Sequence, residues 1–187
     1  AELYREFERS YGDRRVVLGV ERLDYTKGLR LKLEAFERFL QADPSRVDRY
    51  VLLQVVVPSR LDHPAYKGLK SQVEEAIGRI NGVCGRPGRA PVHYLHRSLT
   101  PEELVALYRL AGACLVTPVR DGMNLVAQEF VACQVAPSDL PACNGMLVLS
   151  EFAGAANPLG RALLVNPWHA DRVADALAQA LEMSPVE

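Results

Sequence analysis

The chain has 187 residues, of which 49% are hydrophobic and 24% are charged, and its formal net charge is −1 at pH 7. This size and composition predict one soluble globular domain, and the absence of an apolar run near the roughly 20 residues of a membrane helix excludes a membrane-spanning protein. The small net charge excludes a general attraction to nucleic acid or to an anionic membrane, so any cations that bind an anionic ligand must be placed locally.

Short apolar strands alternate with amphipathic helices along the first half of the chain. A β-branched run predicts a strand at Val16–Val20, and the spacing of apolar residues predicts a helix over Lys27–Asp43. A second strand is predicted at Tyr50–Val57, followed by a helix over Ala65–Ile80. The run "VHYL" at Val92–Leu95 predicts a third strand.

The same alternation continues through the second half. The helix that follows the third strand should begin after Thr100, which together with Glu103 forms a capping box. The fourth strand is predicted at Ala113–Val119 and its helix over Gly122–Cys133. The remaining predicted elements are strands at Gly145–Ser150 and Arg161–Pro167 and a helix over Asp171–Met183.

This order of elements predicts the fold class. Continuous apolar strands indicate a sheet that is covered on both faces, and regular alternation with helices indicates right-handed parallel crossovers. We therefore expect an α/β fold in which residues 1–187 form a single doubly wound, mainly parallel sheet. Two turn-rich segments, Gly82–Pro91 and Ala136–Gly145, are expected to be surface loops. Ligands of such sheets bind at the carboxyl ends of the strands, so the strand-to-helix loops are the candidate sites.

Cations occur in two of these loops. Arg22 and Lys27 follow the first strand, and Arg60 follows the second. Because the chain is slightly acidic overall, three cations at one edge of the sheet favour a site for a diphosphate or another anion. The alternative is that these residues are ordinary solvated surface cations.

The loop after the fourth strand reads "RDGMNLVAQEF". Gly122 is expected to permit a tight turn, and the amides of Met123, Asn124 and Leu125 are expected to open the next helix. A helix start of this kind binds phosphate through unpaired N–H groups and a partial positive charge. Glu129 lies about two helical turns further on, where a carboxylate suits the two hydroxyl groups of a sugar diol.

The sequence lacks the motifs of several common kinds of catalytic and metal site. It lacks Asp-x-Asp, a P-loop, Gly-x-Ser-x-Gly and His-Glu-x-x-His, and its four histidines and four cysteines share no metal-ligand spacing. We therefore expect no metal and no cofactor. The cysteines are expected to be reduced thiols that pack in a cytoplasmic protein.

Eight stretches in family order resemble the trehalose-6-phosphate synthases, which are retaining glycosyltransferases built from two Rossmann-like domains. They are "ERLDYTKGL", "VVPSRLDHPAY", "GRING", "YLHRSL", "LVALY", "LVTPVRDGMNLVAQEFVA", "VLSEFAGAA" and "LLVNPW". The resemblance covers the carboxyl-terminal, donor-binding domain of the glycosyltransferase B fold. It implies transfer of glucose from UDP-glucose to glucose 6-phosphate with retained anomeric configuration, without a metal.

The resemblance also implies roles for particular residues. Arg22 and Lys27 match the cations on the donor diphosphate, Asp121 matches the aspartate on the donor glucose, and Arg60 matches the arginine on the acceptor phosphate. The backbone of Leu99 matches a uracil contact. The turn beside the donor sugar matches Gly122, Met123 and Asn124. The segment beneath the donor matches Leu125, Val126, Ala127, Gln128 and Glu129, with Glu129 on the ribose hydroxyls.

The same resemblance makes the chain a partial one. It begins at Ala1 without an initiator Met, and the amino-terminal domain that supplies much of the acceptor site in this family is missing, so we expect a fragment that is inactive alone. Two loops depart from the family pattern, at "RPGRAPVHY" and "VAPSDLPACNG". The acceptor, the nucleotide base and homo-oligomer formation by the full-length enzyme stay open. Alternatives are a glucosylglycerol-phosphate synthase, a silent nucleotide-sugar-binding regulatory module, and a Rossmann dehydrogenase, which the missing Gly-x-Gly-x-x-Gly disfavours.

Overall fold

The computed structural model describes residues 2–59, 63–134 and 144–182. Within these ranges, six strands form one sheet in the order β3-β2-β1-β4-β5-β6, and neighbouring strands are parallel throughout. The strands are β1 (Arg15–Arg22), β2 (Tyr50–Val57), β3 (Val92–Leu95), β4 (Ala111–Val116), β5 (Met146–Ser150) and β6 (Leu163–Val165).

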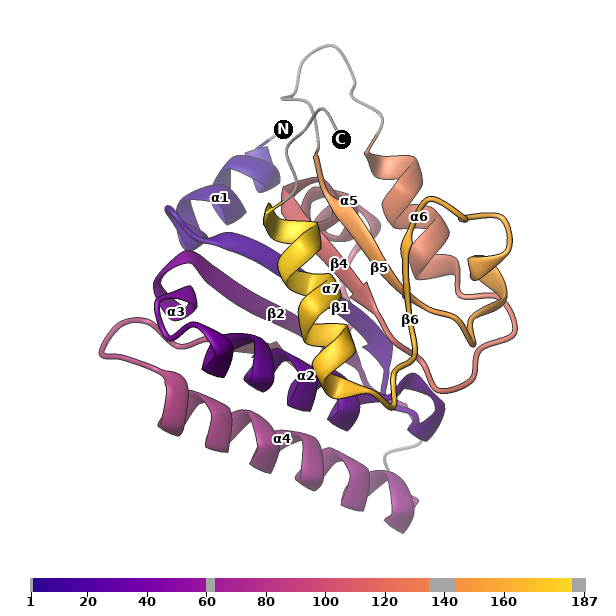
Figure 1. Cartoon of the computed structure of the whole chain (residues 1–187), viewed down its shortest axis with the longest axis horizontal. Coiled ribbons are helices and arrows are strands. Elements are labelled where there is room, and N and C mark those ends of the chain that lie inside the picture. The colour runs from indigo at the N-terminus through magenta and orange to yellow at the C-terminus, as the bar shows by residue number, and fades with distance from the viewer. Residues whose placement is uncertain (1, 60–62, 135–143, 183–187) are drawn as a thin grey trace.

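Helices cover both faces of this sheet (Figure 1). One face carries α2 (Leu29–Ala42), α4 (Pro64–Cys84) and α7 (Ala170–Glu182), and the other carries α1 (Glu2–Tyr11), α5 (Pro101–Leu110) and α6 (Leu125–Cys133). The short helix α3 (Arg46–Arg49) and two 3-10 turns, Tyr25–Lys27 and Gly154–Ala156, complete the described elements. No helix within the described ranges has the length and apolar character needed to cross a membrane.

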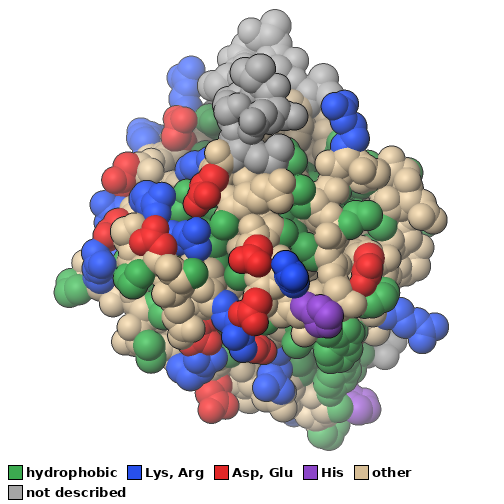
Figure 2. Space-filling model, in the orientation of Figure 1, with side chains coloured by type: hydrophobic (Ala, Val, Ile, Leu, Met, Phe, Trp, Pro, Cys, Tyr) green, Lys and Arg blue, Asp and Glu red, His purple; other side chains and the backbone are tan. Residues whose placement is uncertain are grey.

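The core lies in two apolar layers, one on each face of the sheet. The central strands are buried on both faces because consecutive apolar side chains point alternately into the two layers. This arrangement confirms the predicted doubly wound α/β fold. On the outer face of α2 and α7, acidic and basic side chains are interspersed (Figure 2), and Arg38 bonds to both Glu34 and Asp171 there.

The strand order creates a topological switch point at the centre of the sheet. β1 and β4 are neighbours in space, but the crossovers from β1 lead outward through β2 to β3, whereas those from β4 lead the opposite way through β5 to β6. Ligands of open parallel sheets bind where the loops diverge in this way, outside the carboxyl ends of the strands. The loops after β1 and β4 therefore flank the candidate site.

Several boundaries differ from the sequence-based prediction. β4 ends at Val116 rather than Val119, because Pro118 has no N–H to continue a ladder between two strands. The helix after it starts at Leu125 rather than Gly122, since Asn124 has a φ of 67°, which no helical residue adopts. The segment Gly82–Pro91 is not wholly loop, because α4 continues to Cys84. The last strand is reduced to Leu163–Val165.

Most of the other predicted elements are confirmed. β2 and β3 have the predicted bounds, and Thr100 and Glu103 form the predicted reciprocal capping box. Among the described residues, Cys84, Cys114 and Cys133 form no disulfide. The predicted loop Ala136–Gly145 lies almost entirely outside the described residues.

Gly28 joins the first loop to α2 with a φ of 65°, and a Cβ there would lie 2.4 Å from the carbonyl oxygen of Thr117. Gly28→Ala should therefore lower the free energy of unfolding through both left-handed strain, about 1 to 2 kcal/mol, and a displaced backbone contact, a further ~1 to 3 kcal/mol. Urea denaturation would measure the change.

Gly88→Ala is the matched control. Gly88 has a φ of 73° and nothing within 4 Å of the added Cβ, so only the strain applies. Equal losses in the two variants would contradict a close packing of the Gly28 turn against the end of β4.

Candidate functional site

The loop after β1 is held in shape by Asp24. Its Oδ1 accepts hydrogen bonds from the Thr26 N–H at 2.9 Å and from the Thr26 hydroxyl at 2.7 Å, which starts the 3-10 turn Tyr25–Lys27. Gly28 ends this turn in the left-handed region and leads directly into α2. An Asx cap followed by glycine thus folds the loop tightly and fixes the backbone that carries Lys27.

Backbone hydrogen bonds tie this loop to the loop after β4. The carbonyl of Thr26 accepts from the N–H groups of Val119, at 2.8 Å, and Arg120, at 3.3 Å. The close approach of Gly28 to Thr117 adds a second contact between the same two segments. The two loops at the switch point are therefore joined although about 90 residues separate them.

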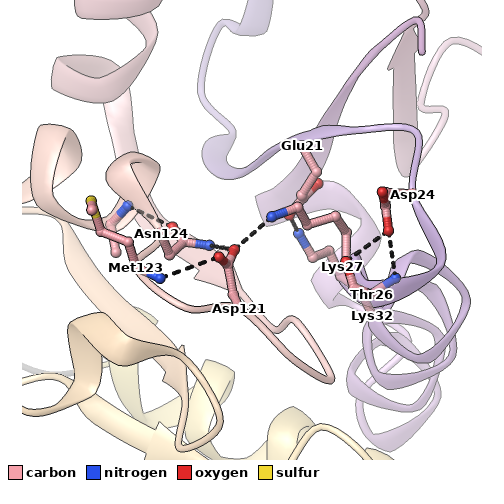
Figure 3. A network of polar contacts seen from close by, with 9 residues as sticks. Glu21, Asp24, Thr26, Lys27, Lys32, Asp121, Met123 and Asn124 are labelled. Atoms are coloured by element: carbon pink, nitrogen blue, oxygen red, sulfur yellow. Dashed lines mark hydrogen bonds and ion pairs between the residues drawn. The ribbon is translucent and has the colours of Figure 1, made fainter. Parts of the chain in front are cut away.

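Lys27 and Asp121 meet across this junction (Figure 3). The Lys27 ammonium lies 2.6 Å from Asp121 Oδ2, and the two side chains are 15% and 14% exposed. Burial acts to raise the pKa of Asp121, but the ammonium and the amide of Asn124 outweigh it and hold that pKa below its ordinary value. Asp121 is therefore a carboxylate at neutral pH, with its charge balanced by Lys27.

Asp121 also organises the start of α6. Its Oδ2 accepts from the Asn124 side-chain amide at 2.9 Å, and its Oδ1 accepts from the Met123 N–H at 3.4 Å. Asn124 in turn caps the helix, since its Oδ1 accepts from the Ala127 N–H at 3.0 Å. A carboxylate, an amide side chain and a helix start thus form one connected unit.

The prediction that the amides of Met123, Asn124 and Leu125 open the helix is wrong in register. The Met123 N–H bonds to Asp121, and Asn124 is the capping residue, so the first helical amides are those of Leu125, Val126 and Ala127. The amides of Leu125 and Val126 have no acceptor among the described residues. These two N–H groups are the ones available to an anion at the positive end of the helix.

Two glycines lie where the loops after β4 and β5 meet. Gly122 is in a bend, but it does not have a positive φ and a Cβ there would meet nothing within 4 Å, so this turn could also form with another residue. Gly154, after β5, is required by packing: its N–H bonds to the Asp121 carbonyl, and its Cβ would lie 2.1 Å from the Gly122 carbonyl oxygen.

Arg22 stands at the exposed end of β1. Its guanidinium forms no hydrogen bond or ion pair with any described residue, although its charge helps to lower the pKa of Asp24. The structure therefore does not bring Arg22 into the Lys27 and Asp121 contact. It leaves Arg22 without an ion pair in the described part of the chain, available to an anionic ligand at the same edge of the sheet.

Glu129 lies on the exposed side of α6 and accepts a hydrogen bond from the Tyr108 hydroxyl at 3.0 Å. Tyr108 comes from α5, and its ring is buried against Phe130. A carboxylate has about four acceptor positions, so Glu129 keeps capacity for a further donor pair.

Leu99 lies just before α5, with its side chain against the apolar layer on that face of the sheet. Its backbone N–H and C=O form no hydrogen bond with other residues in the described ranges. Arg60, predicted for an acceptor phosphate, lies outside the described residues.

The sequence reasoning missed three residues that shape this site. Thr26 joins the two loops through its carbonyl, which no side-chain pattern reveals. Gly154 is a packing glycine within "EFAGAA", where a glycine after a strand could have suggested close backbone approach. Tyr108 reads as an ordinary core aromatic because its helical spacing fits the core.

Together these groups suit an elongated anionic ligand. Arg22, Lys27 and the first amides of α6 can bind a diphosphate, while Asp121 and Glu129 can accept hydrogen bonds from hydroxyl groups. No cluster of three or more potential metal ligands occurs in the described part of the chain.

Comparison with known proteins identifies relatives over the whole chain. The sequence model of glycosyltransferase family 20 matches residues 1–187. The UDP-forming alpha,alpha-trehalose-phosphate synthase A of Dictyostelium discoideum is 48% identical over 183 residues, which are 98% of this chain and 24% of the relative. The corresponding synthase 1 of Arabidopsis thaliana is 50% identical over 184 residues, 98% of this chain and 19% of the relative. The chain thus spans a quarter or less of the length of these two proteins.

Two solved structures share the fold closely. A structure from E. coli bound with UDP-2-fluoro glucose superposes with a TM-score of 0.91 and 41% identity, covering 100% of this chain and 40% of that one. A UDP-forming alpha,alpha-trehalose-phosphate synthase from Burkholderia xenovorans in complex with glucose-6-phosphate gives a TM-score of 0.91 and 40% identity, covering 100% of this chain and 42% of that one. These matches confirm the predicted Rossmann-like domain of the glycosyltransferase B fold.

Asp121→Asn should lower the free energy of unfolding by about 1.5 kcal/mol near neutral pH, because it leaves the Lys27 ammonium without its charged partner. The pKa of Asp121 is lowered by folding, so its stabilising contribution is complete above the unfolded pKa of about 3.9 and is lost as pH falls through the folded pKa. Urea denaturation of both proteins from neutral pH down to about pH 3.5 would test this window. A difference that stays constant to the lowest pH would argue against an ionised Asp121.

Proposed function

Because the chain belongs to glycosyltransferase family 20, we propose that it is the donor-binding half of a UDP-forming trehalose-phosphate synthase. The whole enzyme would transfer glucose from UDP-glucose to glucose 6-phosphate with retained anomeric configuration, releasing trehalose 6-phosphate and UDP. The observation that carries the proposal is the contact of Lys27 with Asp121 at the switch point between β1 and β4. A solved structure 41% identical to this chain and bound with UDP-2-fluoro glucose supports the donor.

The cations would bind the donor diphosphate. An ammonium has three N–H donors, so Lys27 can keep its bond to Asp121 and still donate to a phosphate oxygen. Arg22, which has no ion pair among the described residues, would supply the second charge, and the Leu125 and Val126 amides would supply uncharged donors. These groups would stabilise the negative charge that grows on the leaving UDP, which is the term that usually dominates such catalysis.

The remaining donor contacts would come from the loops on either side. Asp121 would accept from hydroxyl groups of the donor glucose, beside the turn formed by Gly122, Met123 and Asn124. The open space at Gly122 supports a sugar close to this backbone. Glu129 would accept from the ribose hydroxyls at the end of the segment that begins with Leu125, Val126, Ala127 and Gln128.

The nucleotide base and the acceptor sugar phosphate would be bound by residues at the edges of the site. The backbone N–H and C=O of Leu99, which have no partner among the described residues, suit the hydrogen-bonding edge of uracil. Glucose 6-phosphate as acceptor is supported by the Burkholderia xenovorans relative, with Arg60 proposed for its phosphate. Since the chain covers only 42% of that relative, the rest of the acceptor site would lie in the other half of the enzyme.

Titration calorimetry with UDP-glucose, ADP-glucose and GDP-glucose tests the proposed donor. We expect UDP-glucose to bind and UDP to compete with it for one site. Arg22→Ala should weaken UDP-glucose binding by about 1.5 to 3 kcal/mol, the range for a hydrogen bond to a charged group, without loss of stability.

Arg5→Ala, on the exposed side of α1, serves as the control for a lost surface cation and should bind UDP-glucose as the unmodified chain does. Failure of all three nucleotide sugars to bind would overturn the proposed function.

Glu129→Ala tests the ribose contact. It should weaken UDP-glucose binding by about 1.5 to 3 kcal/mol, or roughly tenfold to a hundredfold, because a charged acceptor is removed. Calorimetry would measure this change. The control is Glu75→Ala, an exposed glutamate on α4 across the sheet, which should leave binding unaltered. An unchanged affinity in Glu129→Ala would refute the assignment.

A further inference from the structure

A charged pair lies in the core directly behind the loop that carries the two donor cations. The Lys32 ammonium of α2 bonds to Oε1 of Glu21, which is in β1, and the two side chains are 0% and 4% exposed. Lysine and glutamate are almost never buried this fully unless they are paired. Burial lowers the pKa of Lys32 from its ordinary value, and the adjacent carboxylate opposes that effect by favouring the ammonium.

The neighbouring strands are built around this pair. The other oxygen of Glu21 accepts from the Gln54 amide at 2.6 Å, and that amide is fully buried in β2. A Cβ at Gly19 would lie 2.6 Å from Gln54 Oε1 and 3.0 Å from the Lys32 ammonium, so glycine leaves the space that these groups occupy. Groups from β1, β2 and α2 thus converge on one polar cluster.

Stability alone does not account for a cluster of this kind. Replacing a buried ion pair by apolar side chains is commonly neutral or stabilising, because the desolvation of two charges offsets their attraction. The pair does, however, hold β1 and α2 in one relative position, because the two buried charges must stay in contact.

Glu21 and Lys32 lie on either side, in the sequence, of the loop that carries Arg22 and Lys27. Glu21 immediately precedes Arg22, and Lys32 lies one turn into the helix that follows Lys27. The ion pair between Glu21 and Lys32 therefore joins the two ends of the segment that contains Arg22 and Lys27. The bond from Lys27 to Asp121 attaches the middle of this segment to the loop after β4 (Figure 3).

We propose that Glu21 and Lys32 are positioning residues, whose buried contact sets the loop from Arg22 to Lys27 in the conformation that binds the donor diphosphate. This inference rests on the proposed function for its ligand, and on the described contacts for the loop geometry. Displacing a binding group by about 1 Å can cost a large factor in activity, so a contact at the base of the loop affects both cations at once.

The double variant Glu21→Gln with Lys32→Met separates positioning from stability. It removes both charges and leaves neither one buried without a partner, so its unfolding in urea should be no easier than that of the unmodified chain. We expect its dissociation constant for UDP to rise by about tenfold or more. We also expect faster hydrogen exchange of the backbone amides from Leu23 to Gly28. Unchanged UDP affinity together with unchanged exchange in this variant would overturn the inference.

Two further proteins complete the test. Glu34→Gln with Arg38→Met removes an exposed ion pair from the same helix and should change neither UDP binding nor exchange in the loop. An equal effect there would overturn the specific role of the buried pair. If the first double variant does not fold, Glu21→Asp keeps the charge but shortens the side chain, and it should still weaken UDP binding; unaltered binding in this folded variant would also overturn the proposal.

The two proposals fail in different ways. If the unmodified chain binds neither UDP nor UDP-glucose, the proposed function fails, and the hydrogen exchange of the loop still decides whether the buried pair positions it.

Discussion

The site depends on one geometric constraint, the divergence of the loops after β1 and β4. Parallel strands with right-handed crossovers place successive helices on one face when the chain moves in one direction and on the other when it reverses. In the order β3-β2-β1-β4-β5-β6 that reversal falls between β1 and β4, so their loops lead away from each other at the carboxyl edge. The Thr26 carbonyl and the Lys27 to Asp121 bond connect these two loops.

Charge in this region is arranged locally rather than through the whole molecule. With a net charge of −1 the chain has no overall field to attract an anion, and the described face over α2 and α7 mixes both signs. At the carboxyl edge, Lys27 is balanced by Asp121 whereas Arg22 has no described partner. The folded chain therefore holds one cation in a fixed position and leaves another free to respond to a ligand, and the helix start adds partial charge without any ion.

The fold could be predicted from the sequence because its signals are local and periodic. The apolar run Tyr50–Val57 and the capping box at Thr100 define their elements without help from distant residues. The details of the site depend instead on contacts between distant segments. Asn124 takes a left-handed φ because Asp121 holds its amide, and the Thr26 carbonyl meets a loop about 90 residues away. Lys32 lies three residues after Leu29 and four before Phe36, so its spacing places it on the apolar side of α2, but the spacing does not reveal the carboxylate of β1 that pairs with it there.

The close packing of Gly154 against Gly122 bears on how such a domain can diversify. With the two backbones pressed together, neither loop has slack to accept an inserted residue without breaking the Gly154 to Asp121 hydrogen bond. Lengthening a loop is the usual evolutionary route to a new binding preference, because surface connections tolerate it. Here that route is closed on the side of the proposed sugar contact, so we expect changes of donor among chains with this contact to arise by exchange of side chains at fixed loop length.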